Sequence, residues 1–135
     1  MTVAATETEA GEDTTALEIV VPADPRLLRV LRLVASGVAS LSALSLDGVE
    51  EVRVAVDELG ATLISASAGG PITVRFELDS TTLCVEGSTE VGGSAPLEVD
   101  PLTDRILDAV ATSHEWTSDG GLARCRIEKQ LAPTS

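Results

Sequence analysis

The sequence predicts an α+β fold, a two-layer sandwich in which three helices cover one face of a mixed, mostly antiparallel sheet. Three observations lead to this prediction. Two helical stretches follow a first strand, two hairpins supply the other strands, and a third helical stretch separates the hairpins. The length of 135 residues suits one domain. With 44% hydrophobic residues but only one Phe, one Trp and no Tyr, its core must consist of Leu, Val, Ile and Ala.

The folded domain is expected over residues 16–131. Residues 1–15 are rich in Thr, Glu, Ala and Gly and lack a hydrophobic period, which predicts a disordered acidic arm. Residues 132–135 are expected to form a C-terminal tail. The N-terminus lacks the basic and apolar regions of a secretion signal, and no stretch is apolar enough to span a membrane. We therefore expect a cytoplasmic protein.

The first strand and the first helix are predicted near the N-terminus. Residues 17–21 are rich in β-branched side chains and are followed by Pro22. Asp24-Pro25 then provides an N-cap residue and a proline at the first helical position. A helix is expected next, because apolar residues recur at helical spacing, at Leu27, Leu31, Val34, Val38 and Leu41. Its arginines are expected to lie on a solvated face, at Arg26, Arg29 and Arg32.

The second helix is predicted over residues 45–67, and it carries an acidic pair among apolar neighbours. Its buried stripe consists of residues spaced by three and four, Val49, Val52, Val56, Leu59 and Leu63. The acidic pair is Asp57-Glu58. Because Glu58 and Thr62 are four residues apart, their side chains lie one above the other and can reach one ligand. A solvated helix edge is the alternative interpretation.

The first hairpin follows the second helix. The segment Gly-Gly-Pro at 69–71 ends the helix, and residues 72–78 alternate as a strand. Asp79-Ser80 predicts a turn, and residues 83–85 predict the returning strand. Small residues then predict a loop over residues 87–98.

The third helix and the second hairpin complete the predicted fold. Asp100-Pro101 repeats the helix-start signal, and the helix is expected to end near His114. The second hairpin is expected to begin at Trp116, turn at residues 118–121 and return over residues 122–131. His114 is interpreted as a helix-end histidine without a catalytic partner.

Charge and composition exclude some classes of partner. The formal net charge is −13 and the chain has a single lysine, so a phosphate backbone or an anionic membrane would be repelled. The scarcity of aromatic residues also argues against stacking on bases. We therefore expect no nucleic-acid or membrane partner, but a basic protein. Cys84 and Cys125 lack the spacing of a zinc site and are interpreted as buried, reduced thiols.

Three segments carry a resemblance to a known family, VPADPRLLRVLRLVASGVAS, DGVEEVRVAVDELGATLI and DPLTDRILDAVATSHEW. Together with the element order they resemble the anti-sigma regulatory factors of the GHKL ATPase superfamily, of the actinobacterial general-stress type, over residues 16–131. The resemblance implies a histidine-kinase-like ATPase fold with a shortened lid. It also implies a sigma factor and an anti-anti-sigma antagonist as partners, and a homodimer.

The resemblance assigns site residues as well. In the superfamily the second helix supplies a glutamate that activates a nucleophile and, four residues later, an asparagine that coordinates magnesium. Glu58 matches the glutamate, and Thr62 stands at the asparagine position, where a hydroxyl is a poorer magnesium ligand. The adenine-binding DxGxG motif is expected after the strand at 83–85. There Glu86 replaces the aspartate and Gly87 is the one glycine in register.

The phosphate-binding part of the family's site is altered in this sequence. The glycines that should open the last helix lie upstream, at Gly92-Gly93, and Asp100-Pro101 stands at the helix start. A negative charge and a missing N–H at that point disfavour phosphate. A complete site would hold ATP and Mg²⁺, whereas these departures predict a degraded site with no resident cofactor.

The expected function is that of an anti-sigma factor, which binds and sequesters a sigma factor. The alternative is an active ATP-dependent serine/threonine kinase of the same family, with Glu58 as general base, that phosphorylates the antagonist. A third interpretation is a scaffold whose loop at 87–98 binds another partner.

Overall fold

The computed structural model describes residues 1–7, 14–92 and 97–131. Its elements, in chain order, are β1 (Thr2–Glu7), β2 (Thr15–Val21), a short 3-10 helix η1 (Pro25–Leu27), α1 (Leu28–Ala39), α2 (Leu46–Ala66), β3 (Ile72–Leu78), β4 (Thr82–Glu90), α3 (Pro101–Val110), β5 (Ser113–Asp119) and β6 (Leu122–Gln130). No helix in these described ranges is long and apolar enough to cross a membrane.

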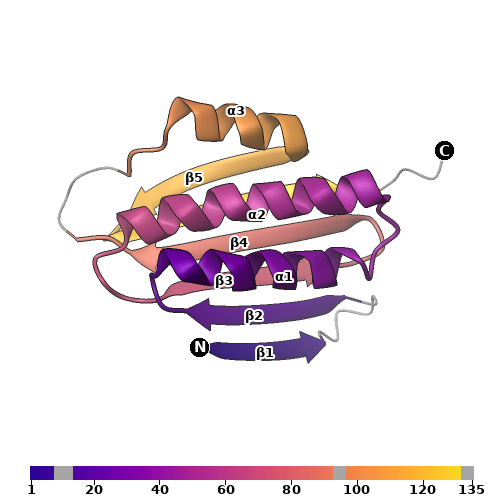
Figure 1. The fold of residues 1–135 in the computed structure, drawn as a ribbon, viewed down its shortest axis with the longest axis horizontal. Coiled ribbons are helices and arrows are strands. Elements are labelled where there is room, and N and C mark those ends of the chain that lie inside the picture. The colour runs from indigo at the N-terminus through magenta and orange to yellow at the C-terminus, as the bar shows by residue number, and fades with distance from the viewer. Residues whose placement is uncertain (8–13, 93–96, 132–135) are drawn as a thin grey trace.

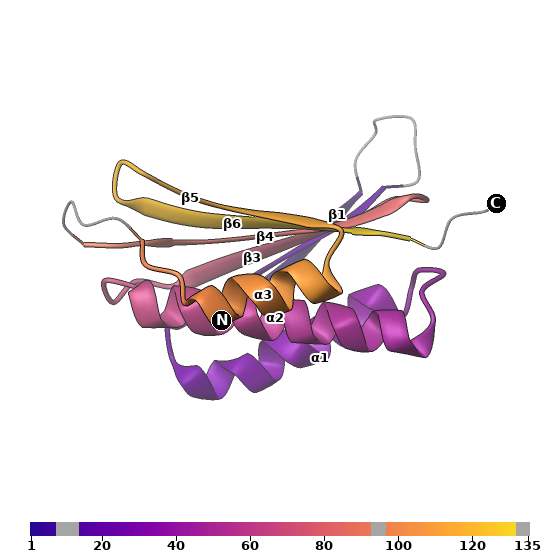
Figure 2. The same cartoon turned by 90° about the horizontal axis from the view of Figure 1, so that it is seen from above.

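The fold is α+β, as predicted, with the helices packed against a sheet (Figure 1). The sheet has six strands in the order β1-β2-β3-β4-β6-β5. All three α-helices lie on one face of the sheet (Figure 2), and α2 lies between α1 and α3 (Figure 1). Each pair of neighbouring strands is antiparallel, so the prediction of a mixed sheet is wrong.

The N-terminal residues differ from their prediction. Thr2–Glu7 form β1, which pairs with β2 from Thr2 opposite Val20 to Glu7 opposite Thr15. The predicted disordered arm is therefore wrong for these residues. An edge strand is held by main-chain hydrogen bonds to one neighbour, so its sequence need not show the alternation of a central strand. The rest of the predicted arm, residues 8–13, and the predicted tail, residues 132–135, lie outside the described residues.

Polar side chains cap the start of each helical segment. The Asp24 carboxylate accepts a hydrogen bond from the Arg26 N–H at 2.9 Å, just before α1. Ser45 Oγ accepts from the Gly48 N–H at 3.1 Å and caps α2. Each cap satisfies a backbone donor that the first helical turn leaves without a partner.

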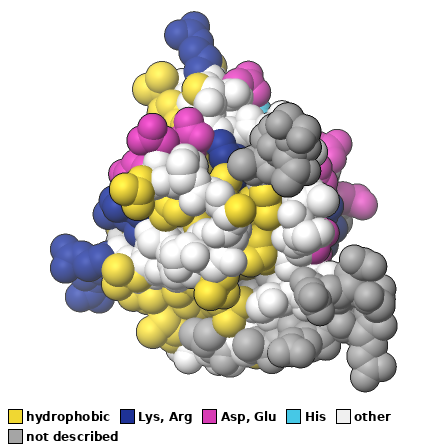
Figure 3. All heavy atoms as spheres, turned by 90° about the vertical axis from the view of Figure 1, so that its right-hand side faces the viewer, with side chains coloured by type: hydrophobic (Ala, Val, Ile, Leu, Met, Phe, Trp, Pro, Cys, Tyr) yellow, Lys and Arg dark blue, Asp and Glu magenta, His cyan; other side chains and the backbone are white. Residues whose placement is uncertain are grey.

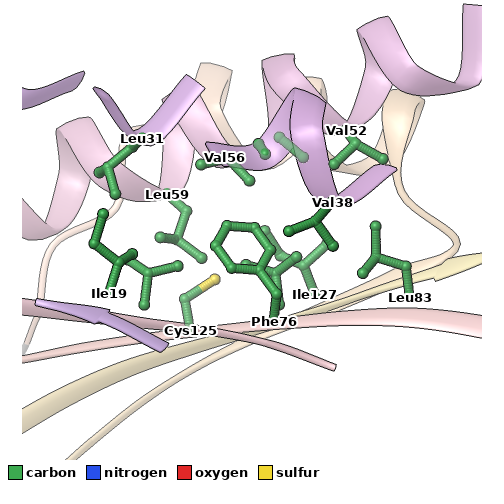
Figure 4. Close-up of a cluster of buried hydrophobic side chains, with 14 of the residues drawn as sticks. Ile19, Leu31, Val38, Val52, Val56, Leu59, Phe76, Leu83, Cys125 and Ile127 are labelled. Atoms are coloured by element: carbon green, nitrogen blue, oxygen red, sulfur yellow. The ribbon is translucent and has the colours of Figure 1, made fainter. Parts of the chain in front are cut away.

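The core lies between the helices and the sheet (Figure 4). It includes most of the aliphatic side chains that the helical and strand patterns predicted, with Phe76 near its centre. Leu41 is an exception, because it follows the end of α1 and is 70% exposed. The labelled members are Ile19, Leu31, Val38, Val52, Val56, Leu59, Phe76, Leu83, Cys125 and Ile127.

Gly87 lets α2 approach the sheet closely. A Cβ atom at this position would lie 2.6 Å from Leu59 Cδ2 and 2.7 Å from Leu63 Cδ1, closer than packed carbon atoms come. The absence of a side chain at Gly87 thus leaves room for two leucines of the buried stripe of α2.

The strand β4 is longer than predicted. It continues to Glu90, because the residues after Val85 pair with β3 on one side and with β6 on the other. The predicted loop at 87–98 therefore begins only at Val91, and its residues 93–96 lie outside the described part of the chain.

The third helix is shorter than predicted. It ends at Val110, and Ala111 is already extended, with φ −116° and ψ 155°. The Thr112 N–H donates to the Glu128 carbonyl at 2.9 Å, so the chain joins the sheet at once. His114 consequently lies in β5 and not at a helix end.

The face of the sheet opposite the helices carries a row of charges, which we call the charge ladder. Its members stand directly opposite one another on five adjacent strands and alternate in sign, in the order Glu18, Arg75, Glu86, Arg126 and Glu115. Opposite charges at directly paired positions stabilise neighbouring strands.

Candidate functional site

A pocket of about 470 Å³ lies beside the C-terminal half of α2. Its wall on α2 consists of Glu58, Ala61, Thr62, Ser65 and Ala66. The opposite wall is formed by residues that follow β4 and by the start of α3, namely Val91, Gly92, Leu97, Glu98, Asp100 and Thr103. The volume falls in the range of small-ligand sites, roughly 300–1,000 Å³.

The structure brings Glu58 and Thr62 together in this pocket, as their spacing of four residues predicted. The sequence did not indicate a third residue, Thr103 of α3, which is only 8% exposed. Its hydroxyl donates a hydrogen bond to Glu58 Oε1 at 3.1 Å. One oxygen of the predicted catalytic carboxylate therefore already has a partner within the protein.

Asp100 occupies the N-terminus of α3 at the edge of the pocket. Its Oδ1 accepts a hydrogen bond from the Leu102 N–H at 2.8 Å, and Pro101 has no N–H to offer. A helix N-terminus usually favours an anion. At α3 the protein's own carboxylate takes that place, so this end of the helix disfavours a bound phosphate.

The pocket as a whole is acidic. Glu58, Glu98 and Asp100 line it, whereas none of the nine lysine and arginine residues of the chain does. Residues 93–96, which lie outside the described ranges, are Gly, Ser, Ala and Pro and contain no basic side chain. A triphosphate would meet carboxylates without a compensating cation of the protein.

The other two predicted site residues lie elsewhere. Gly87 lies beneath Leu59 and Leu63 in the core. Glu86 belongs to the charge ladder, opposite Arg75 and Arg126, on the face of the sheet that the helices do not cover. Neither residue lines the pocket, so the structure does not bring Glu86 and Gly87 together with Glu58 and Thr62. The separation follows from the strand length, because the residues directly after β4 are Val91 and Gly92 and not the segment 86–89.

Asp57, the neighbour of Glu58, has a structural partner. Its Oδ1 accepts a hydrogen bond from Arg32 Nε at 2.8 Å, which joins α2 to α1. The two carboxylates of the acidic pair thus have different surroundings, one between two helices and one in the pocket. Arg32, predicted to lie on a solvated face, is partly buried and ion-paired.

His114 joins α3 to the edge strand β5. Its Nε2 lies 3.0 Å from Asp104 Oδ1 and its Nδ1 lies 3.3 Å from Asp108 Oδ1. The imidazole is 11% exposed, so the two aspartates, one helical turn apart, hold a largely buried ring. His114 does not line the pocket, and its ring nitrogens face Asp104 and Asp108 of α3.

The two cysteines are free and buried, as predicted. Cys125 lies in the core opposite Gly87, whereas Cys84 lies opposite Glu128, on the other face of the sheet. Burial raises the pKa of the Cys125 thiol to about 12, and Asp104 adds to the effect. Burial also raises the pKa of Cys84. Because the two cysteines lie on opposite faces of the sheet, a disulfide between them would require a change in strand pairing.

The pocket does not fit a nucleotide with magnesium. Of the two residues that the family resemblance assigns to the metal step, Glu58 accepts a hydrogen bond from Thr103, and Thr62 offers a neutral hydroxyl. Within the described ranges, no group of three His, Cys, Asp or Glu side chains is arranged to hold a metal ion. The carboxylates that line the pocket would also repel a polyphosphate.

The chain matches no protein-family model and no curated protein. An assignment of function must therefore come from its residues and their arrangement.

Proposed function

We propose that the protein is an anti-sigma factor, a cytoplasmic homodimer that sequesters a sigma factor and is released by an anti-anti-sigma antagonist. The resemblance of residues 21–40, 47–64 and 100–116 to anti-sigma regulatory factors supplies the identity of the partner. The layering, with the helices on one face of a sheet, is compatible with the fold that this resemblance implies. The acidic pocket favours a binding role over phosphoryl transfer.

The observation that carries the proposal is the distribution of charge. The chain has 22 acidic and 9 basic residues. Six of the nine basic side chains form ion pairs with acidic residues of the described chain, namely Arg26, Arg32, Arg53, Arg75, Arg126 and Lys129. The remaining acidic surface is suited to a partner rich in arginine and lysine, as a DNA-binding protein is.

Exposed leucines offer apolar contacts for such a partner. Leu41 and Leu46, at the connection between α1 and α2, are 70% and 89% exposed. Figure 3 shows hydrophobic side chains at this end of the molecule, with both basic and acidic side chains around them. An apolar centre with a charged rim is typical of protein interfaces.

The proposal is tested by titrating the protein against the purified sigma factors of the source organism and measuring association rates. We expect one of them to bind, and its association rate to fall as salt rises from about 50 to about 500 mM. Leu46→Asp should weaken the complex. Leu102→Asp, a matched change at an exposed leucine of α3, serves as the control. If no sigma factor binds, the proposal is wrong.

The kinase alternative has one observation in its favour, since Glu58 and Thr62 share a pocket large enough for a small ligand. Its test is thermal unfolding with ATP and Mg²⁺. A nucleotide at about a hundred times its dissociation constant would stabilise the fold by about 2.7 kcal/mol. An unchanged melting temperature under those conditions rules this function out.

A further inference from the structure

We propose that the pocket beside α2 binds a guanidinium group on an aliphatic stem, in the place where the family resemblance puts a nucleotide. This inference goes beyond the proposed function, because a small guanidine can test it without any sigma factor. It rests on the disagreement between the lining of the pocket and the chemistry of a triphosphate.

The charges of the pocket favour an organic cation. Glu58 comes from the middle of α2, whereas Glu98 and Asp100 lie two residues apart in the segment that leads into α3. A cation in the pocket would be attracted by all three carboxylates and would meet no basic side chain. An anion in the same place would be repelled by the three carboxylates.

The hydrogen bonds of the pocket favour a group with several donors. The Thr103 hydroxyl donates a hydrogen bond to Oε1 of Glu58, whereas Oε2 of Glu58 accepts no hydrogen bond from the described residues. Oδ1 of Asp100 accepts a hydrogen bond from the Leu102 N–H, whereas Oδ2 of Asp100 has no donor among the described residues. Guanidinium carries five N–H donors in one plane and can reach oxygens that are spaced apart. Magnesium instead needs oxygens converging at about 2.1 Å.

The rest of the lining suits an aliphatic stem. Ala61, Ala66, Val91 and Leu97 supply apolar surface beside the carboxylates. Long basic side chains bury their methylene groups against such surface while the charged end meets polar atoms. A free alkylguanidine and the side chain of an arginine in a partner protein share this chemistry.

The test is calorimetric titration with butylguanidine, with butylurea as the neutral ligand of the same shape. We expect saturable binding of butylguanidine and none of butylurea. Asp100→Asn keeps a good helix cap but removes a charge, and it should weaken binding about tenfold, the loss of one charge-assisted hydrogen bond. Asp47→Asn, the same change in the exposed first turn of α2, should leave binding unchanged.

A blocked tripeptide with a central arginine distinguishes the two sources of the ligand. Binding of this peptide at the same site places an arginine of a protein partner in the pocket, whereas binding of butylguanidine alone indicates a small molecule. Equal binding of butylguanidine and butylurea, an Asp100→Asn variant with unchanged affinity, or competition by ATP with Mg²⁺ would each overturn the inference. Circular dichroism of each variant confirms that it is folded.

Discussion

Gly87 is a residue whose role depends on its tertiary neighbours. As part of a sequence motif it suggested a contact with adenine, but in the structure it lies under two leucines of α2. A glycine followed by polar residues looks the same in a ligand-binding loop and in a strand beneath a helix. Only the position of α2 over β4 separates the two cases.

Gly87→Ala is expected to destabilise the protein by about 1–3 kcal/mol, because the added methyl group overlaps Leu59 and Leu63. Gly37→Ala is the matched control. Gly37 lies in α1 with no atom near the added group, and there the change should stabilise the helix by up to about 1 kcal/mol. Urea denaturation measures both. Equal effects of the two changes would contradict the packing role of Gly87.

Cys125 predicts a pH dependence of stability. Its pKa is raised by burial to about 12 in the folded protein, whereas the thiol of an unfolded chain ionises near its ordinary pKa of 9.0. A raised folded pKa gives stability that is complete below the unfolded value and is lost as pH rises toward the folded value. The free energy of unfolding should therefore fall by up to about 1.4 kcal/mol per pH unit above about pH 9.

The control is Cys125→Ala, which lacks the thiol and should show a shallower loss of stability over the same pH range. Denaturant unfolding at several pH values measures both proteins. Identical slopes for the variant and the parent would mean that the thiol ionises as readily in the folded protein as in the unfolded chain.

At the scale of elements, helices were easier to predict than strands. The Asp-Pro signals at Asp24 and Asp100 and the stripes of apolar residues are local signals, and they located the helices. The second half of β4 lacks a comparable signal, since Gly87, Ser88 and Thr89 become a strand only through their pairing with β3 and β6. The edge strand β1 was missed for the same reason.

The candidate site likewise has one part that local patterns predict and one part that they do not. The pair Glu58 and Thr62 follows from helical geometry alone and was predicted. Thr103 and Asp100 reach the same pocket from another helix, 45 residues from Glu58 in the case of Thr103. No local pattern indicates such a contact, so the electrostatic character of the pocket emerges only from the folded arrangement.

The attachment of α3 to β5 depends on His114. His114→Phe keeps a large ring and a residue that favours strands, but it removes both contacts with Asp104 and Asp108. We expect a loss of about 1 kcal/mol, since both aspartates are solvent-exposed enough to be screened. Amide hydrogen exchange within α3 should become faster. Arg105→Ala, at an exposed position of the same helix, is the control and should leave exchange unchanged.

At the scale of the whole molecule, the layers were predicted but the order of the strands was not. The alternation of helical and strand segments along the chain is enough to place helices on a sheet. The order of the strands depends on pairings between segments far apart in the sequence, and β6 lies between β4 and β5.

The net charge of −13 predicts that salt stabilises the folded protein. Acidic groups repel one another more strongly in the compact state than in the unfolded chain. Raising salt from about 50 to about 500 mM should therefore increase the melting temperature by a few degrees, despite weaker surface ion pairs. A variant with Asp47→Asn, Glu90→Gln and Asp119→Asn, three exposed acids, should show a smaller increase. A melting temperature that falls with salt would mean that ion pairs outweigh the repulsion.

The charge ladder also protects the alignment of the strands. If β4 moved by two residues against its neighbours in one direction, the side chains would stay on the same face, but Glu86 would stand opposite Glu77 on β3 and opposite Glu128 on β6. Like charges would then meet at both borders of the central strand. The bare side of the sheet, which has no hydrophobic pattern to penalise such a slip, thus discriminates against misaligned pairing by electrostatic repulsion.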